Sequence, residues 1–271
     1  MSQEAEPTDA ARKTVVYQIP GMDAVAVRRD VEYQGADGGA LTLDVYYPPD
    51  ATLGARLPAV VIVAGFPDPG FQRMMGCKFK DMGSSVSWGR LAAASGIVAV
   101  TYTNLEPERD LHALLEHLRQ NAASLGIAEH RIAVWASSGN VPLALSILMR
   151  EPRSAFKCAV FCYGFSLDLD GSTLVAEAAR QWGFANPGAG RSVADLPVDL
   201  PLFVARAGRD EIPHLNEALD LFLAAAVSCN LPISFVNHPT APHAFDLMDD
   251  SATSREIIAS ILAFMRFHLT A

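Results

Sequence analysis

The chain has 271 residues and a formal net charge of −9 at pH 7. This acidity disfavours nucleic acid as a partner, because affinity for nucleic acid comes largely from Lys and Arg side chains that meet phosphates. Hydrophobic residues make up 50% of the chain, which is ample for a core, and the longest apolar runs are strand-sized and too short to span a bilayer.

Residues 1–22 read as a polar tail, with one short extended piece over residues 14–19. Residues 23–271 are predicted to form one domain. No positively charged region leads into an apolar stretch near the N-terminus, so a secretory signal is not expected and the protein is predicted to be cytoplasmic. The four cysteines are scattered, and neither they nor the histidines have the spacing of a zinc site, so no bound metal is expected.

Strand-like and helix-like segments alternate along the rest of the chain. Two β-rich runs, 25–33 and 41–47, surround a Gly-rich turn and predict a hairpin. The Val/Ile/Ala run 58–64 predicts a strand buried on both faces of a parallel sheet, and an irregular loop rich in Gly and Pro follows it over residues 65–84. Further strands are predicted at 97–102, 131–135, 156–163, 202–205 and 233–237, and helices at 85–94, 110–125, 141–150, 174–182, 213–229 and 254–269.

This alternation predicts an α/β protein whose mostly parallel sheet is covered by helices on both faces. Ligands of such sheets bind outside the carboxyl ends of the strands. Candidate catalytic residues should therefore come directly after strands.

A serine follows the strand predicted at 131–135, where the chain turns straight into a helix. A serine in such a tight turn has its hydroxyl pushed above the sheet, and the turn needs small residues two positions before and after it. Ser138 is flanked in this way by Ala136 and Asn140, whereas Ser137 would be flanked by the bulky Trp135. Ser138 is therefore the predicted nucleophile, although both glycines of the G-x-S-x-G pattern are replaced.

An acid and a base follow two later strands. Asp210 comes after a strand and a Gly turn, with Glu211 as its alternative, and His243 lies in the loop after the last strand, better placed than His238. The order Ser138, Asp210, His243 is the one expected of a hydrolase triad on this type of sheet. His243 would take the serine proton while Asp210 orients the imidazole, and an acyl-enzyme would form. The backbone N–H groups of Gly139 and Phe66 are the predicted oxyanion-hole donors.

At this point the sequence resembles the α/β-hydrolase superfamily, especially its dienelactone-hydrolase-like and small esterase or lipase branches, over nearly the whole chain. The segments that carry the resemblance are 43–48, Gly65-Phe66, the turn at Ser138, 208–210 and 242–245. The resemblance implies an eight-stranded sheet with one antiparallel strand near its edge, and no cofactor. Dienelactone hydrolases have a Cys nucleophile, and many lipase-like members have His-Gly-Gly at the oxyanion loop, so this chain departs from both patterns.

Three side chains are candidates for substrate binding. Arg73 and Lys80, together with Lys78, lie on the loop predicted after the oxyanion turn and could hold a carboxylate or phosphate. Trp182 lies in the stretch 165–199, which occupies the place of a lid in members of this fold and could line an acyl pocket.

The leading hypothesis is a serine hydrolase that cleaves carboxylic esters of small or medium soluble substrates. A thioesterase or a peptidase of the same fold is the alternative among enzymes. A non-catalytic ligand-binding protein of the hydrolase fold is the alternative from another class, and a homodimer is a candidate assembly. The sequence does not give the physiological substrate.

Overall fold

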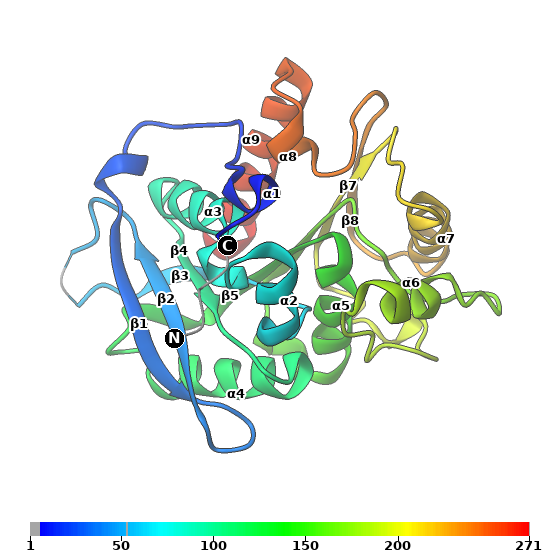
Figure 1. The fold of residues 1–271 in the computed structure, drawn as a ribbon. Coiled ribbons are helices and arrows are strands. Elements are labelled where there is room, and N and C mark those ends of the chain that lie inside the picture. Colours follow the sequence, from blue (N-terminus) through cyan, green and yellow to red (C-terminus); the bar gives the residue numbers. More distant parts are fainter. Residues whose placement is uncertain (1–5, 53, 271) are drawn as a thin grey trace.

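The computed structural model describes residues 6–52 and 54–270, which are built around one eight-stranded sheet (Figure 1). The strand order is β1-β2-β4-β3-β5-β6-β7-β8. Strand β2 runs antiparallel to both of its neighbours, and the other neighbouring pairs run parallel. The predicted sheet with one antiparallel strand near its edge is thus confirmed. The strands are β1 (Ala26–Gln34), β2 (Ala40–Tyr47), β3 (Leu57–Ile62), β4 (Val98–Tyr102), β5 (Ile127–Ser137), β6 (Cys158–Cys162), β7 (Leu202–Ala207) and β8 (Ile233–His238).

Helices cover both faces of this sheet (Figure 1). Because crossovers between parallel strands are right-handed, the reversal of direction between β3→β4 and β4→β5 sends the connecting helices α3 and α4 to opposite faces. The connections β5→β6 and β7→β8 advance in the same direction as β4→β5, so helices α5 and α7 lie on the same face as α4. Helix α9 lies on the face of α3 and packs against strands β3, β5, β6, β7 and β8. The helices are α1 (Asp9–Arg12), α2 (Asp68–Met75), α3 (Gly83–Ala94), α4 (Pro107–Gln120), α5 (Val141–Arg150), α6 (Leu174–Trp182), α7 (Leu215–Ser228), α8 (Phe245–Met248) and α9 (Ala252–Thr270).

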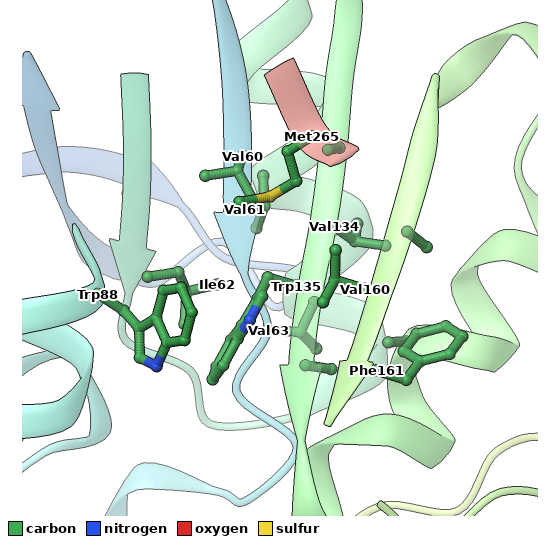
Figure 2. Packing of buried hydrophobic residues seen from close by; sticks show 14 of the residues in the cluster. Val60, Val61, Ile62, Val63, Trp88, Val134, Trp135, Val160, Phe161 and Met265 are labelled. Carbon is green, nitrogen blue, oxygen red and sulfur yellow. The ribbon is translucent and has the colours of Figure 1, made fainter. Parts of the chain in front are cut away.

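The core lies on both faces of the central strands, as continuous apolar runs require. Strands β4 and β6 are buried at every position. In Figure 2, Met265 of α9 lies beside Val60 and Val61 of β3, and Trp88 of α3 lies beside Trp135 of β5. These two indole rings are 4.8 Å apart between centroids. Among the described residues, no helix is long and apolar enough to cross a membrane.

The N-terminal segment differs from the predicted tail. Its residues from Glu6 onward are laid along α2, α3 and α8, and Val15 is 3% exposed. Backbone hydrogen bonds fix the segment, from Thr8 N to Met75 O (3.0 Å) and from Val16 N to Asp246 O (2.8 Å). Two glycines allow the N-terminal segment to lie this close, since a Cβ at Gly76 would be 2.2 Å from the Glu6 carbonyl oxygen and one at Gly83 would be 2.6 Å from the Lys13 carbonyl oxygen. Isolated apolar residues in a polar stretch gave no periodic signal of this packing.

The predicted irregular loop 65–84 contains helix α2 and the short 3-10 helix η2 (Phe79–Asp81). Helix α2 begins just after Pro67 and ends at Met75, where it is capped by Gly76 with a φ of 78° in the left-handed region. Proline at a helix start and glycine at its end are ordinary boundary signals. Because these signals lie so close together here, the sequence between them was interpreted as a loop and not as a helix of two turns. The buried Asp68 carboxylate accepts from the backbone N–H groups of Phe79 (3.1 Å) and Asn104 (2.9 Å), which anchors the segment.

Candidate active site

Ser138 sits on a strained turn between strand β5 and helix α5. The strand ends at Ser137, and the 3-10 helix η3 (Ser138–Asn140) leads directly into α5. Ser138 has a φ of 54°, in the left-handed region that side-chain-bearing residues rarely adopt. Such strain is typical of a nucleophile held above a sheet.

The room for this turn comes from another strand. A Cβ at Gly164, just after β6, would lie 2.2 Å from Val141 Cγ2 and 3.1 Å from the Ser138 carbonyl oxygen. The space that the two missing glycines would leave around the serine turn is therefore supplied by Gly164, which is distant in sequence.

The structure brings the three predicted triad side chains together. His243 Nε2 lies 3.0 Å from Ser138 Oγ, and His243 Nδ1 lies 2.6 Å from Asp210 Oδ2. The Asp210 side chain is fully buried and the imidazole is 26% exposed. Glu211, the alternative acid to Asp210, is exposed. His238, the other candidate base, is buried, and its Nε2 lies 3.1 Å from Asp249 Oδ2.

Backbone contacts hold the acid loop against the base loop. Gly208 N donates to His238 O and Arg209 N donates to Ala241 O, both at 2.8 Å. A Cβ at Gly208 would lie 2.6 Å from the Pro239 carbonyl oxygen, so only glycine permits this approach. The Asp210–His243 contact is thus built on a rigid junction between the ends of β7 and β8.

Asn140 links the serine turn to the loop after β3. Its Oδ1 accepts from Gly65 N (2.7 Å), and its Nδ2 donates to Ser137 O (3.0 Å). The Asn140 backbone is in the ordinary right-handed helical region, with φ −86°. The asparagine therefore suits this position through its side-chain hydrogen bonds, without any unusual backbone angle.

The same contact places the two predicted oxyanion donors on adjoining backbone segments. A Cβ at Gly65 would lie 2.9 Å from both Asn140 Cα and Gly139 O, so the Gly65-Phe66 backbone passes directly against the serine turn. As the second residue of η3, Gly139 has no intrahelical acceptor for its N–H group. Within the described chain, the Phe66 N–H group has no hydrogen-bond acceptor either.

Two cavities meet at Ser138. The larger one has a volume of about 290 Å³ and extends from Ser138 and His243 between α2, α3 and α8 to the N-terminal segment, where Ala10 and Lys13 line it. The smaller one, of about 90 Å³, lies against the insertion 165–199. A substrate with two unequal substituents on one reacting carbon fits this arrangement.

A buried carboxylate that the sequence did not single out lies behind His243. Asp246 Oδ1 accepts from the Tyr163 hydroxyl (2.5 Å), and its Oδ2 accepts from Trp88 Nε1 (2.7 Å). The Tyr163 ring packs edge-on against His243, with 5.0 Å between centroids. Burial raises the pKa of Asp246 above its ordinary value. The available signals were the position of Asp246 three residues after His243 and that of Tyr163 directly after β6.

Of the three predicted substrate-binding side chains, Trp182 reaches the site. It lines the smaller cavity together with Phe184 and Phe66, and it is 47% exposed. The insertion 165–199 is fixed to the oxyanion loop by a hydrogen bond from Ala185 N to Gly65 O (2.8 Å); its mobility as a lid stays a prediction. Arg73 is exposed on α2 and is not among the residues that line either cavity.

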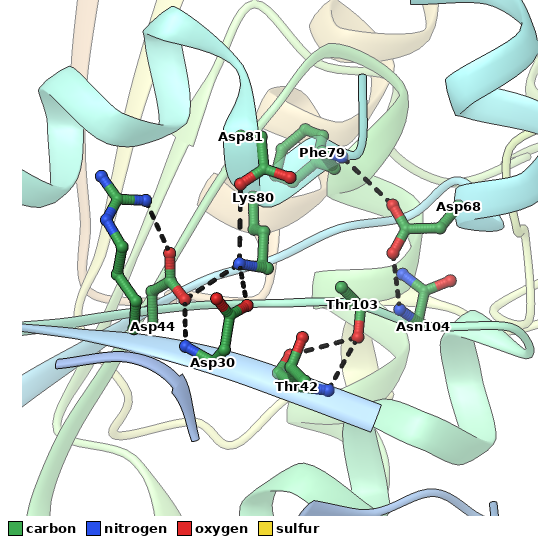
Figure 3. Close-up of polar contacts among 10 residues, drawn as sticks. Asp30, Thr42, Asp44, Asp68, Phe79, Lys80, Asp81, Thr103 and Asn104 are labelled. Carbon is green, nitrogen blue, oxygen red and sulfur yellow. Dashed lines mark hydrogen bonds and ion pairs between the residues drawn. The ribbon is translucent and has the colours of Figure 1, made fainter. Parts of the chain in front are cut away.

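The predicted role of Lys80 in substrate binding is wrong. Its side chain is 4% exposed, and Nζ lies 2.9 Å from Asp30 Oδ1 and 2.9 Å from Asp44 Oδ1 (Figure 3). Burial would lower the pKa of Lys80, but the hydrogen bonds to these two carboxylates outweigh burial and raise it. The ammonium group neutralises Asp44, which is 0% exposed, and ties η2 to the β1–β2 hairpin.

We expect Lys80→Met to lower the free energy of unfolding by about 3 kcal/mol, because the buried Asp44 carboxylate would keep only the half-exposed Arg29 guanidinium, 3.3 Å from Oδ2, as its cation. Urea denaturation measures this loss. The matched control is Lys78→Met, on an exposed neighbour, with an expected change within about 0.5 kcal/mol. A raised KM with unchanged stability in Lys80→Met would restore the binding role.

Among the described residues, no group of three or more His, Cys, Asp or Glu side chains could hold a metal ion. The site itself offers the serine hydroxyl, the imidazole, the carboxylate and the backbone amides around them.

Comparison with known proteins identifies the class by architecture: the chain has the α/β-hydrolase fold. No protein-family model and no curated protein matches the sequence. Among solved structures, a brefeldin A esterase, described as a bacterial homologue of human hormone sensitive lipase, superposes with a TM-score of 0.72 at 17% identity, covering 96% of this chain and 82% of the esterase. A thermostable carboxylesterase from a metagenomic library gives 0.67 at 20% identity (94% and 92% covered), and a Pyrobaculum calidifontis esterase gives 0.64 at 23% (91% and 86%).

Proposed function

We propose that this protein is a serine hydrolase that cleaves carboxylic esters through an acyl-enzyme. The observation that carries the proposal is the bonded relay from Ser138 Oγ through His243 to the buried Asp210 carboxylate. A serine hydroxyl is a weak nucleophile, and an adjacent imidazole oriented by a carboxylate is the arrangement that activates it.

In this mechanism His243 Nε2 takes the Ser138 proton as Oγ attacks the ester carbonyl. Asp210 keeps the imidazole in the required tautomer and stabilises the cation that forms. The N–H groups of Gly139 and Phe66 stabilise the oxyanion of the tetrahedral intermediate. His243 then protonates the leaving alcohol, and water, activated in the same way, releases the acid.

The two cavities support an ester with unequal substituents. The larger cavity, of about 290 Å³, has room for a medium-sized group, and the smaller one, of about 90 Å³, for a short group. The names of the similar solved structures, which are esterases and a carboxylesterase, favour an oxygen ester over a thioester or a peptide. The completeness of the relay weighs against a non-catalytic binding protein, which has no use for all three side chains. The dienelactone-hydrolase-like branch remains a prediction from the resemblance.

The test uses the intact protein with matched substrates of one acyl chain: a nitrophenyl ester, a thioester and an anilide. We expect the ester to be hydrolysed with the highest kcat/KM. We also expect a fluorophosphonate to raise the mass of the protein by one phosphonyl group, as mass spectrometry would show. A higher kcat/KM for the thioester or the anilide would transfer the proposal to that class. Absence of both turnover and labelling would favour the ligand-binding alternative.

A further inference from the structure

The two cavities that meet at Ser138 lie against different catalytic groups. In the described part of the chain, His243 lines the larger cavity and not the smaller one. Gly139, whose N–H group is a predicted oxyanion donor, lines the smaller cavity and not the larger one. Ser138 lines both. The nucleophile therefore lies between a cavity beside the base and a cavity beside an oxyanion donor.

The tetrahedral intermediate of the proposed mechanism gives each of these cavities a role. Its central carbon is bonded to Ser138 Oγ, to the oxyanion, to the leaving oxygen of the alcohol and to the acyl chain. His243 Nε2 has to protonate the leaving oxygen, so this oxygen must lie within hydrogen-bond reach of the imidazole. The alcohol is thus directed into the cavity that His243 lines, and the acyl chain into the cavity beside Gly139.

The smaller cavity is short, and its wall is fixed by packed aromatic rings. A Cβ at Gly139 would lie 2.7 Å from Phe184 Cδ1 and 2.9 Å from Phe66 Cζ, so both rings lie directly against this glycine. Phe165 stacks on Phe184 with 5.4 Å between the ring centroids, and both side chains are buried. The cavity volume is about 90 Å³. Since a cavity of about 150 Å³ holds benzene, the smaller cavity suits a group of about three carbons.

The larger cavity has a volume of about 290 Å³ and a more adaptable wall. Its lining includes the methionines Met74, Met75, Met82 and Met248, of which Met74 and Met248 are about half exposed. Methionine side chains are unbranched and flexible, so they adapt to irregular apolar shapes. This side of the site therefore suits a medium-sized apolar group of more than one shape.

We propose that the smaller cavity binds the acyl chain and the larger cavity binds the alcohol, so that the preferred substrates are esters of short acids, acetic to butyric, with medium-sized apolar alcohols. This inference rests on the proposed ester hydrolysis. It also accounts for the second half of the reaction. Departure of the alcohol empties the cavity beside His243, which is the side from which the activated water has to reach the acyl carbon.

The test compares two isomers in which the ester group is reversed, hexyl acetate and methyl heptanoate. Proton release measures their hydrolysis by the wild-type protein, and each kcat/KM is divided by the rate constant for hydroxide-catalysed hydrolysis of the same ester. We expect the corrected value for hexyl acetate to be at least about tenfold higher, because even one methylene group that does not fit an apolar pocket changes kcat/KM by about tenfold or more.

Two exposed residues, one in each cavity wall, provide matched variants. Trp182 is 47% exposed and lines the smaller cavity, so Trp182→Ala should admit longer acyl chains and reduce the ratio of hexyl acetate to methyl heptanoate severalfold. Ala10 is exposed and lines the larger cavity. Ala10→Trp should therefore lower kcat/KM for hexyl acetate and leave that for ethyl acetate within about twofold of the wild-type value. Circular dichroism verifies that both variants are folded.

The outcomes separate this inference from the proposed function. A higher corrected value for methyl heptanoate, or equal values for the two isomers, would overturn the assignment of the cavities and leave ester hydrolysis standing. An unchanged ratio in folded Trp182→Ala would also contradict the assignment, since the acyl chain would then lie elsewhere. Hydrolysis of none of the three esters would refute the proposed function, and this inference with it.

Discussion

Ser138→Ala should lower kcat for the best ester about a million-fold, because removing the nucleophile of a serine hydrolase leaves only binding and the oxyanion donors. The free energy of unfolding should stay within about 0.5 kcal/mol of the wild-type value, since alanine keeps the same backbone and loses one hydroxyl. Steady-state kinetics and urea denaturation on the same preparations measure both quantities. Ser137→Ala is the matched neighbour, and it should still react with a fluorophosphonate.

A second substitution at this position separates strain from chemistry. Ser138→Gly also removes the nucleophile, but glycine adopts a φ of 54° without steric cost, so this variant should be about 1 kcal/mol more stable than Ser138→Ala. An inactive protein that gains stability would show that the turn stores strain at its functional residue. Substantial activity in either variant would contradict the assignment of Ser138 as the nucleophile.

Asp210→Asn should lower kcat about 10⁴-fold, while KM changes little. The asparagine amide donates to His243 Nδ1, so the imidazole proton moves to Nε2, where a base is needed to accept from Ser138. The asparagine oxygen still accepts from Ile212 N, the bond that Asp210 makes at 3.0 Å, so the fold should be preserved. Circular dichroism and the rate of fluorophosphonate labelling accompany the kinetics.

The control for Asp210 is its neighbour. Glu211 is exposed and was the alternative acid from sequence, so Glu211→Gln should keep kcat within about twofold. A loss below tenfold in Asp210→Asn, or an equal loss in Glu211→Gln, would show that the acid has been misassigned.

Most of the helices and strands were predictable because their signals are local. Helices α5 and α6 have the predicted boundaries, and the buried strands were recognisable as short apolar runs between turns. The boundaries moved where a capping residue competed with the hydrophobic stripe. Helix α4, for example, begins at Pro107 and ends at Gln120, whereas the stripe suggested 110–125.

The three residues of the relay were also predictable, because each follows its own strand and the parallel sheet brings strand ends to one edge. The contacts around them were not. Gly164, Asn140 and Tyr163 act on the site through neighbours that come from other strands, and no spacing along the chain indicates those partners.

The sequence alone determined most of the helices and strands and where chemistry could occur, since periodicity and turn residues depend on neighbours along the chain. The tertiary structure decided which polar groups are buried and what they meet. Lys80 is 50 residues from Asp30 and 36 from Asp44, and Trp135 meets Trp88 across a strand and a helix. Burial depends on distant segments that pack together. For this reason Lys80, which the sequence places in a polar loop, is the buried partner of Asp44, and Trp135 lines the larger cavity.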